Sequence, residues 1–193
     1  MTRALCLLAL VLPTMGCRGE PAATSNPPAP PPVSAATPER PATPAARIRV
    51  DLATDKGTIQ LDLDPSAAPK TVESFVKLVK EGFYDGMPFH RVEPGFVIQA
   101  GDPALVGKPP AGFTIPDEVS PIKHVRGVIA MARIYRGGQM VPNSASTQFY
   151  ITLGDAPHLD RMGFTAFGRV VKGMEVADKI VVGNRIATAR VVG

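Results

Sequence analysis

Apolar and polar side chains alternate in two short segments of this chain, which is the period of a β-strand with one buried face. Residues 47–52 and residues 58–63 both follow this pattern, and a tight turn, Asp55-Lys56-Gly57, lies between them. The pattern predicts a β-hairpin whose apolar face belongs to a core.

The period becomes helical over residues 71–81, where Val72 and Phe75 fall on an apolar side and charged residues fall on the other. We expect an amphipathic helix there, with Gly82 ending it. A second, shorter helix is expected over residues 174–181, because its apolar positions also share one side.

Further segments have the composition of short strands and are separated by glycine and proline turns. They are residues 86–92, 96–100, 128–132, 148–152, 167–170 and 186–192, the last of which could return to pair with the first strand. Many short strands with two helices indicate an antiparallel sheet closed or nearly closed on itself, since closure removes exposed edges. The pattern predicts a mainly β fold, a small β-barrel with helices over its ends. A two-sheet sandwich is the alternative.

The N-terminal quarter has a different composition. Residues 1–16 combine Arg3 with an apolar run too short to span a membrane as a mature helix, which is typical of a secretory signal. The run ends in Thr14-Met15-Gly16-Cys17, which resembles a bacterial lipobox except that Thr14 replaces the usual leucine. We expect lipidation of Cys17, and a simple cleaved signal is the alternative. The protein is therefore expected in the periplasm or cell envelope, anchored to a bacterial membrane.

Residues 17–46 are rich in proline and alanine, with too little apolar bulk to offset the entropy of ordering, so they predict a disordered tether. The remaining region, 47–193, is long enough for one domain core. Both cysteines, Cys6 and Cys17, precede it, so no disulfide is expected in that domain. The domain is expected to be a monomer.

Charge and spacing argue against several classes of function. The net charge is +4 with the basic residues scattered, which does not indicate a nucleic-acid surface. The three histidines lack the spacing of metal ligands. Neither paired carboxylates nor a serine–histidine arrangement stands out, and no cofactor is expected.

The stretch from Phe89 to Asp102 places a single guanidinium, that of Arg91, among apolar side chains. A guanidinium is always charged and offers five donors, so it normally faces water. Arg91 either forms a surface ion pair or projects into an apolar groove to bind a carbonyl or amide. The segment alone leaves both interpretations open.

Four motifs in order resemble those of the cyclophilin family of peptidyl-prolyl isomerases. They are APKTVESFVKLVKEGFYDGMPFHRVEPGFVIQAGD at 68–102, GVIAMAR at 127–133, NSASTQFYITL at 143–153 and HLDRMGFTAFGRVVKGMEVADKI at 158–180. The resemblance covers the domain from residue 47 to residue 193. It implies a closed eight-stranded antiparallel β-barrel capped by two α-helices, and an isomerase that acts on proline-containing polypeptides and assists the folding of exported proteins.

The resemblance also implies roles for individual residues. Arg91 matches the catalytic arginine and Gln99 the glutamine that orients it. Phe96, Val97, Tyr150 and Leu159 match the lining of the proline pocket, Ala132, Arg133 and Gln148 match residues that contact the peptide backbone, and Phe149, His158 and Phe164 match neighbouring positions of the groove. Strand alternation alone would put Val97 and Gln99 on one face of the strand and Phe96 on the other face with Ile98. The placement of Phe96 in the pocket is therefore implied only by the resemblance to the family.

The chain departs from the best-known eukaryotic members at several of these positions. Val97 replaces a methionine, and Tyr150 replaces a phenylalanine, adding a hydroxyl that needs a partner if it is buried. Arg133 replaces an asparagine. His158 stands where a tryptophan contacts cyclosporin inhibitors, and Phe164 where a histidine lies in the groove, which argues against strong inhibition.

The implied reaction needs few chemical groups, because rotation about an X-Pro bond transfers no proton and breaks no covalent bond. A guanidinium that donates to the prolyl nitrogen would stabilise the twisted transition state more than the planar ground state. The alternative interpretation is a tethered peptide-binding or chaperone module whose isomerase activity is incidental.

Overall fold

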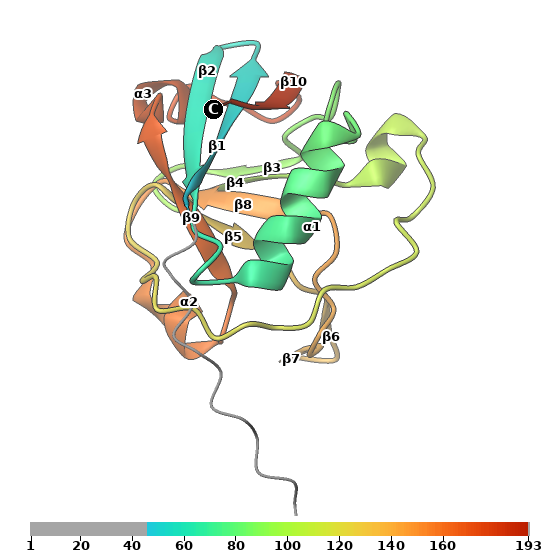
Figure 1. The fold of residues 1–193 in the computed structure, drawn as a ribbon, viewed down its shortest axis with the longest axis vertical. Coiled ribbons are helices and arrows are strands. Elements are labelled where there is room, and N and C mark those ends of the chain that lie inside the picture. The colour runs from blue at the N-terminus through green and yellow to red at the C-terminus, as the bar shows by residue number, and fades with distance from the viewer. Residues whose placement is uncertain (1–45, 193) are drawn as a thin grey trace, which may run out of the picture. The chain divides into compact units, whose positions relative to one another are not determined.

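The computed structural model describes residues 46–192 (Figure 1). The expected signal peptide, the lipidation site at Cys17 and the tether up to residue 45 lie outside the described residues. Within residues 46–192, no helix has both the length and the apolar character that a membrane span requires.

The main element is an eight-stranded antiparallel sheet with the strand order β10-β1-β2-β9-β5-β8-β4-β3. Its strands are β1 (Ile48–Thr54), β2 (Gly57–Leu63), β3 (Arg91–Glu93), β4 (Val97–Ala100), β5 (Val128–Met131), β8 (Phe149–Thr152), β9 (Ala166–Lys172) and β10 (Ile186–Val191). A separate two-stranded sheet joins β6 (Tyr135–Arg136) and β7 (Gln139–Met140). The prediction of a mainly β, antiparallel fold is confirmed.

The first hairpin follows the alternation of its sequence. β1 and β2 pair in continuous register from Ile48 opposite Leu63 to Thr54 opposite Gly57. Their alternate apolar residues, such as Val50 and Leu61, are fully buried. β10 returns to pair with β1, as the pattern predicted.

The sheet is curled but open, so the expectation of a closed barrel is not confirmed. Its two ends, β10 and β3, form no strand ladder with each other in the described part of the chain. Residues 86–90, predicted as strand, are irregular because Gly86 has a φ of 77° and Pro88 has no N–H to donate. Backbone hydrogen bonds from residues 86–89 to residues 183–186 bridge the gap instead.

Three α-helices and one 3₁₀ helix accompany the sheet in residues 46–192. They are α1 (Pro69–Lys80), α2 (Pro157–Arg161), α3 (Met174–Ala177) and η1 (Pro103–Val106). α1 matches its prediction, and Gly82 follows it with a φ of 65°. α3 is shorter than the predicted helix over residues 174–181, and periodicity did not indicate α2, which is only five residues long.

The two faces of the sheet carry two apolar clusters. One is the main core inside the curl, where α1 contributes Phe75 and the strands contribute residues such as Ile98. The other lies on the opposite face, where Val97 and Tyr150 pack with Leu159 of α2. Because successive side chains in a strand point to opposite faces, β4 and β8 each supply residues to both clusters.

Candidate active site

A pocket of about 260 Å³ lies beside the second cluster. It is lined by Arg91, Phe96, Val97, Gln99, Ala132, Arg133, Tyr135, Met140, Tyr150, Leu159 and Phe164. β4 is paired with β3 on one side and β8 on the other, which places Arg91 opposite Gln99 and Gln99 opposite Tyr150. The structure therefore brings together residues that are up to 73 positions apart in the sequence, Arg91 and Phe164.

Arg91 forms a surface ion pair and also lines the pocket, so the two alternatives that its sequence left open both apply. Its Nε and Nη2 atoms contact Glu93 Oε1 at 2.8 and 2.7 Å, an ion pair between side chains that are each about half exposed. The same guanidinium lies at the pocket, with Cζ 5.8 Å from the centre of the Phe96 ring. Exposed ion pairs contribute little stability, so the pair with Glu93 adds little to the stability of the fold. Sequence reasoning did not identify Glu93.

Gln99 connects Arg91 to Gln148. Its Oε1 atom accepts from Arg91 Nη1 at 3.4 Å, and its Nε2 atom donates to Gln148 Oε1 at 2.8 Å. A glutamine amide has one acceptor end and one donor end, so these two neighbours determine its orientation. Gln148 itself lines an adjoining pocket of about 430 Å³, and its carbonyl accepts from Ala132 N at 2.9 Å.

Aromatic rings form much of the pocket wall. Phe96 packs against the second cluster and stacks on His158, with ring centres 5.4 Å apart. The rings of Phe164 and Tyr150 pack edge to face, with their centres 5.8 Å apart. The turn before β4 places Phe96 on the same side as Val97, where strand alternation alone would not put it. His158 supports Phe96 from outside and does not line the pocket.

The buried hydroxyl of Tyr150 has a partner that the sequence did not reveal. It lies 3.0 Å from His124 Nε2, and His124 Nδ1 lies 2.7 Å from Asp160 Oδ1. With the ring proton on Nδ1 facing the carboxylate, Nε2 accepts from the tyrosine hydroxyl. Burial raises the pKa of Tyr150, so the hydroxyl keeps its proton. Burial alone would raise the pKa of Asp160, but hydrogen bonds from His124 outweigh it and lower that pKa.

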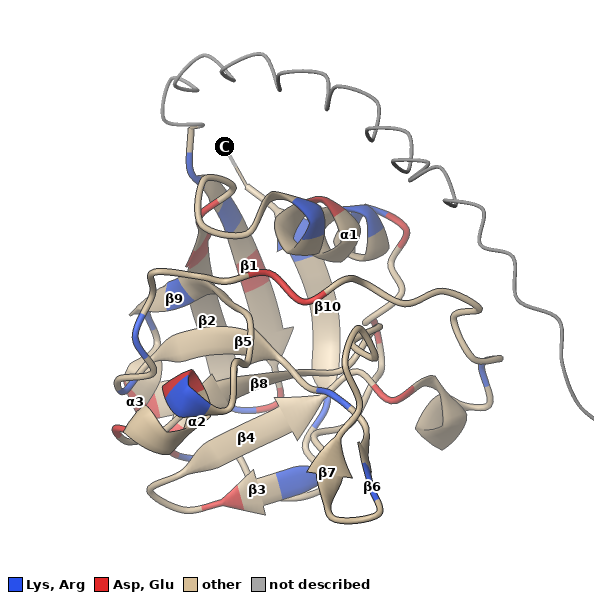
Figure 2. Cartoon of the chain, turned by 90° about the horizontal axis from the view of Figure 1, so that it is seen from below, with Lys and Arg blue, Asp and Glu red and all other residues tan. Residues whose placement is uncertain are grey.

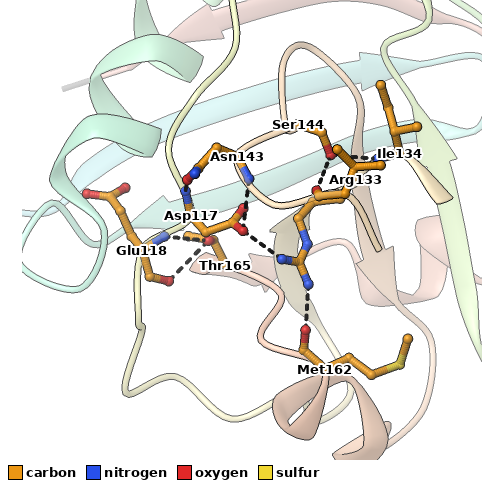
Figure 3. A network of polar contacts seen from close by, with 9 residues as sticks. Asp117, Glu118, Arg133, Ile134, Asn143, Ser144, Met162 and Thr165 are labelled. Atoms are coloured by element: carbon orange, nitrogen blue, oxygen red, sulfur yellow. Dashed lines mark hydrogen bonds and ion pairs between the residues drawn. The ribbon is translucent and has the colours of Figure 1, made fainter. Parts of the chain in front are cut away.

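Arg133 is held by the protein on two sides (Figure 3). Its Nη1 atom donates to Asp117 Oδ2 at 2.7 Å, and its Nη2 atom donates to the Met162 carbonyl at 2.5 Å. The guanidinium also lies 4.9 Å above the ring of Phe164, and only 8% of the side chain is exposed. Arg133 thus forms a wall shared by the two pockets, with its Nη atoms already engaged.

The structure corrects the placement of Phe149. Its side chain is fully buried in the main core, edge to face with Phe75 at 5.4 Å and with Tyr84 at 5.3 Å. Since Tyr150 faces the pocket, its neighbour in the same strand must face the other way. Phe149 therefore supports the sheet from behind and cannot touch a substrate.

The site offers hydrogen bonding and an apolar surface. No group of three potential metal ligands occurs among residues 46–192. A charged donor, Arg91, lies at the rim of an aromatic pocket. Beside it, the side-chain amides of Gln99 and Gln148 are hydrogen-bonded to each other. This arrangement can hold a small apolar ring and donate a hydrogen bond to an atom next to it.

Comparisons with known proteins agree with this geometry. Residues 49–192 match the family model described as cyclophilin type peptidyl-prolyl cis-trans isomerase/CLD. A peptidyl-prolyl cis-trans isomerase of Synechococcus elongatus is 39% identical over 143 residues, 73% of this chain and 94% of its own length. Peptidyl-prolyl cis-trans isomerase B of Bacillus subtilis is 40% identical over 141 residues, 72% of this chain and 94% of its own length.

A solved structure shares the fold. The cyclophilin type isomerase of Cryptosporidium parvum superposes with a TM-score of 0.66 at 28% identity, covering 76% of this chain and 98% of its own. The family model spans most of the chain, and the bacterial relatives exceed a third identity over nearly their full length. The chain therefore belongs to the cyclophilin-type peptidyl-prolyl cis-trans isomerases, which confirms the enzyme class expected from its motifs.

Proposed function

We propose that the pocket binds the proline of a polypeptide and that Arg91 stabilises the twisted transition state of the preceding peptide bond. The observation that carries this proposal is the position of Arg91, which is hydrogen-bonded to Gln99 at the rim of a pocket lined by Phe96 and Tyr150. A related structure, that of the Cryptosporidium parvum cyclophilin, was determined in the presence of the dipeptide Ala-Pro. That ligand supports proline-containing peptides as the substrate class.

The chemical reason lies in the amide bond itself. Rotation has a barrier of about 18–20 kcal/mol because amide resonance is lost. In the twisted state the prolyl nitrogen regains a lone pair, which can accept a hydrogen bond that the planar amide cannot accept. A donor placed at that nitrogen lowers the barrier because it stabilises the transition state alone.

Arg91 does not account for all of the expected acceleration. Shortening an isomerisation from tens of seconds to milliseconds requires roughly 10⁴-fold, or about 5–6 kcal/mol. A charge-assisted hydrogen bond supplies about 1.5–3 kcal/mol. The remainder has to come from the pocket walls, which hold the proline ring while the flanking chain rotates.

An NMR exchange assay on a short Ala-Pro-Phe peptide tests this role. Arg91→Ala is expected to lower kcat/KM by about 10- to 100-fold, the factor that corresponds to one charge-assisted hydrogen bond. Arg190→Ala is the matched control, since Arg190 is also an exposed arginine in an ion pair, with Asp85, but lies on β10 away from the pocket. Equal rates for Arg91→Ala and the unchanged chain would refute the proposal.

We further propose that the enzyme is exported, carries a lipid anchor on Cys17 and assists the folding of exported proteins. The apolar run in residues 1–16 and the Pro-rich stretch that follows support this location. Growth with labelled palmitate is expected to label the chain in the membrane fraction, and Cys17→Ser is expected to abolish the label. A labelled Cys17→Ser chain would exclude this anchor and leave the isomerase proposal unaffected.

A further inference from the structure

The hairpin of β6 and β7 is a separate element beside the pocket. Figure 2 shows it as a separate hairpin outside the main sheet, and Figure 1 places it below β3 and β4. Its turn is Gly137-Gly138, with φ angles of 60° and 82°. Two successive positive φ angles are typical of the tight hairpin turns that match the twist of paired strands, so the loop has a defined shape.

The base of the hairpin is closed by a buried hydroxyl (Figure 3). Ser144 Oγ accepts from Ile134 N at 3.0 Å and donates to the Val141 carbonyl at 2.6 Å. Val141 N also donates to the Ile134 carbonyl at 2.9 Å. The preceding residue, Arg133, is held by Asp117 and by the Met162 carbonyl. The hairpin therefore leaves the domain at a fixed place and in a fixed direction.

Two side chains of the hairpin reach the pocket. Tyr135 and Met140 are paired across its strands, and both line the pocket that contains Arg91 and Phe96. Neither belongs to an apolar cluster of the core, and Tyr135 is 63% exposed. The fold gains little from exposed apolar surface of this size, whereas a ligand that covered it would gain affinity.

We propose that Tyr135 and Met140 form a selectivity wall, which contacts the side chain next to the substrate proline and favours apolar or aromatic residues there. This inference rests on the proposed function, because it assigns a substrate preference to the same pocket. A tyrosine ring offers a large apolar face with little conformational freedom to lose, and a methionine adapts its shape to the side chain that it meets. The two charged residues that line the pocket, Arg91 and Arg133, are paired with Glu93 and Asp117, so their charges are offset.

The test uses the full chain and two proline peptides that differ only at the residues flanking proline, alanine in one and phenylalanine in the other. The unchanged chain is expected to show the higher kcat/KM for the phenylalanine peptide. The double variant Tyr135→Ser, Met140→Ser is expected to reduce this preference by about three- to tenfold, the effect of losing part of an apolar side-chain contact. The matched control is Val181→Ser, Val182→Ser, which removes two exposed apolar side chains that do not line the pocket and is expected to keep the preference.

A second measurement does not depend on turnover. With ¹³C-methyl methionine, the resonance of Met140, assigned by Met140→Leu, is expected to shift on addition of the phenylalanine peptide and to shift less with the alanine peptide. An unmoved Met140 resonance would overturn the selectivity wall.

The outcomes separate this inference from the function on which it rests. If the unchanged chain isomerises neither peptide, the proposed function fails and the inference fails with it. If the chain isomerises both peptides with equal kcat/KM, or if the double variant keeps the preference or loses both rates in equal proportion, the selectivity wall is wrong while the isomerase function stands.

Discussion

At the scale of single residues, the environment of Tyr150 shows how one added hydroxyl changes a site. The hydroxyl is buried against His124, which in turn contacts Asp160. Tyr150, His124 and Asp160 thus form a chain of hydrogen bonds beneath an otherwise apolar pocket wall. A buried chain of this kind is sensitive to the loss of any member, because the remaining partner keeps its desolvation penalty.

We therefore expect Tyr150→Phe to destabilise the fold although it adds no bulk. The substitution leaves the Nε2 atom of His124 buried without a partner, which costs about 1–3 kcal/mol. Urea denaturation measures the change in the free energy of unfolding. Tyr135→Phe is the matched control, because the exposed Tyr135 hydroxyl gains nothing from burial and its loss should leave that free energy nearly unchanged. Equal effects of the two substitutions would contradict the role given to His124.

At the scale of secondary structure, α1 depends on a residue from a distant loop. Its N-cap is Ala68, whose methyl side chain cannot accept hydrogen bonds from the free N–H groups of the first turn. Glu118 takes that role, since its carboxylate accepts from Lys70 N at 3.0 Å and from Thr71 N at 2.8 Å. The backbone of Glu118 is in turn tied to the hydroxyl of Thr165 (Figure 3). The helix and the loop thus stabilise each other.

Removing this cap is expected to weaken the helix start. Glu118→Ala should lower the free energy of unfolding by about 1–2 kcal/mol, the usual contribution of an N-cap, and should speed amide hydrogen exchange in the first turn of α1. Glu73→Ala serves as control, because Glu73 is exposed on the same helix and caps nothing. Unchanged exchange in Glu118→Ala would show that the cap contributes little.

At the scale of the whole domain, several carboxylates join segments that are far apart in the chain. Asp85 contacts Arg190 at 2.8 Å, and Asp178 contacts Arg126 at 2.6 Å. Hydrogen bonds from these arginines lower the pKa of each aspartate below its ordinary value of 3.8. Burial lowers the pKa of His90 below its ordinary value of 6.5. In each case the unfolded chain binds protons more readily than the folded domain does.

Stability is therefore expected to fall with acidification. The aspartate contributions are complete above pH 3.8 and are lost as the pH falls through the lower pKa values of the folded domain, while His90 adds a shallower loss below pH 6.5. Urea unfolding at a series of pH values measures this profile. In Asp85→Asn the steep acid limb should become flatter. An unchanged slope in that variant would remove Asp85 from the explanation.

The sequence predicted best those elements whose structure depends mainly on their own residues. The hairpin of β1 and β2 and the helix α1 follow from periodicity, because each buries one face that its own residues define. Strand alternation likewise placed Val97 and Gln99 together, and the structure has both lining the pocket. Four ordered motifs, including the one around Arg91, led to the family, and the family model matches the domain. Ordered motifs of this kind carry information that composition and periodicity lack.

The sequence by itself determined the class of fold, the family and the segment that holds the charged donor, because these depend on residues close together in the chain. The tertiary structure decided the rest. Only contacts across the fold turn Phe149 into the core, bring Glu118 to α1 and His124 to Tyr150, and leave β10 and β3 as the two ends of an open sheet. The physical reason is that burial and hydrogen-bond partners are set by contacts across the fold, which a local pattern does not encode.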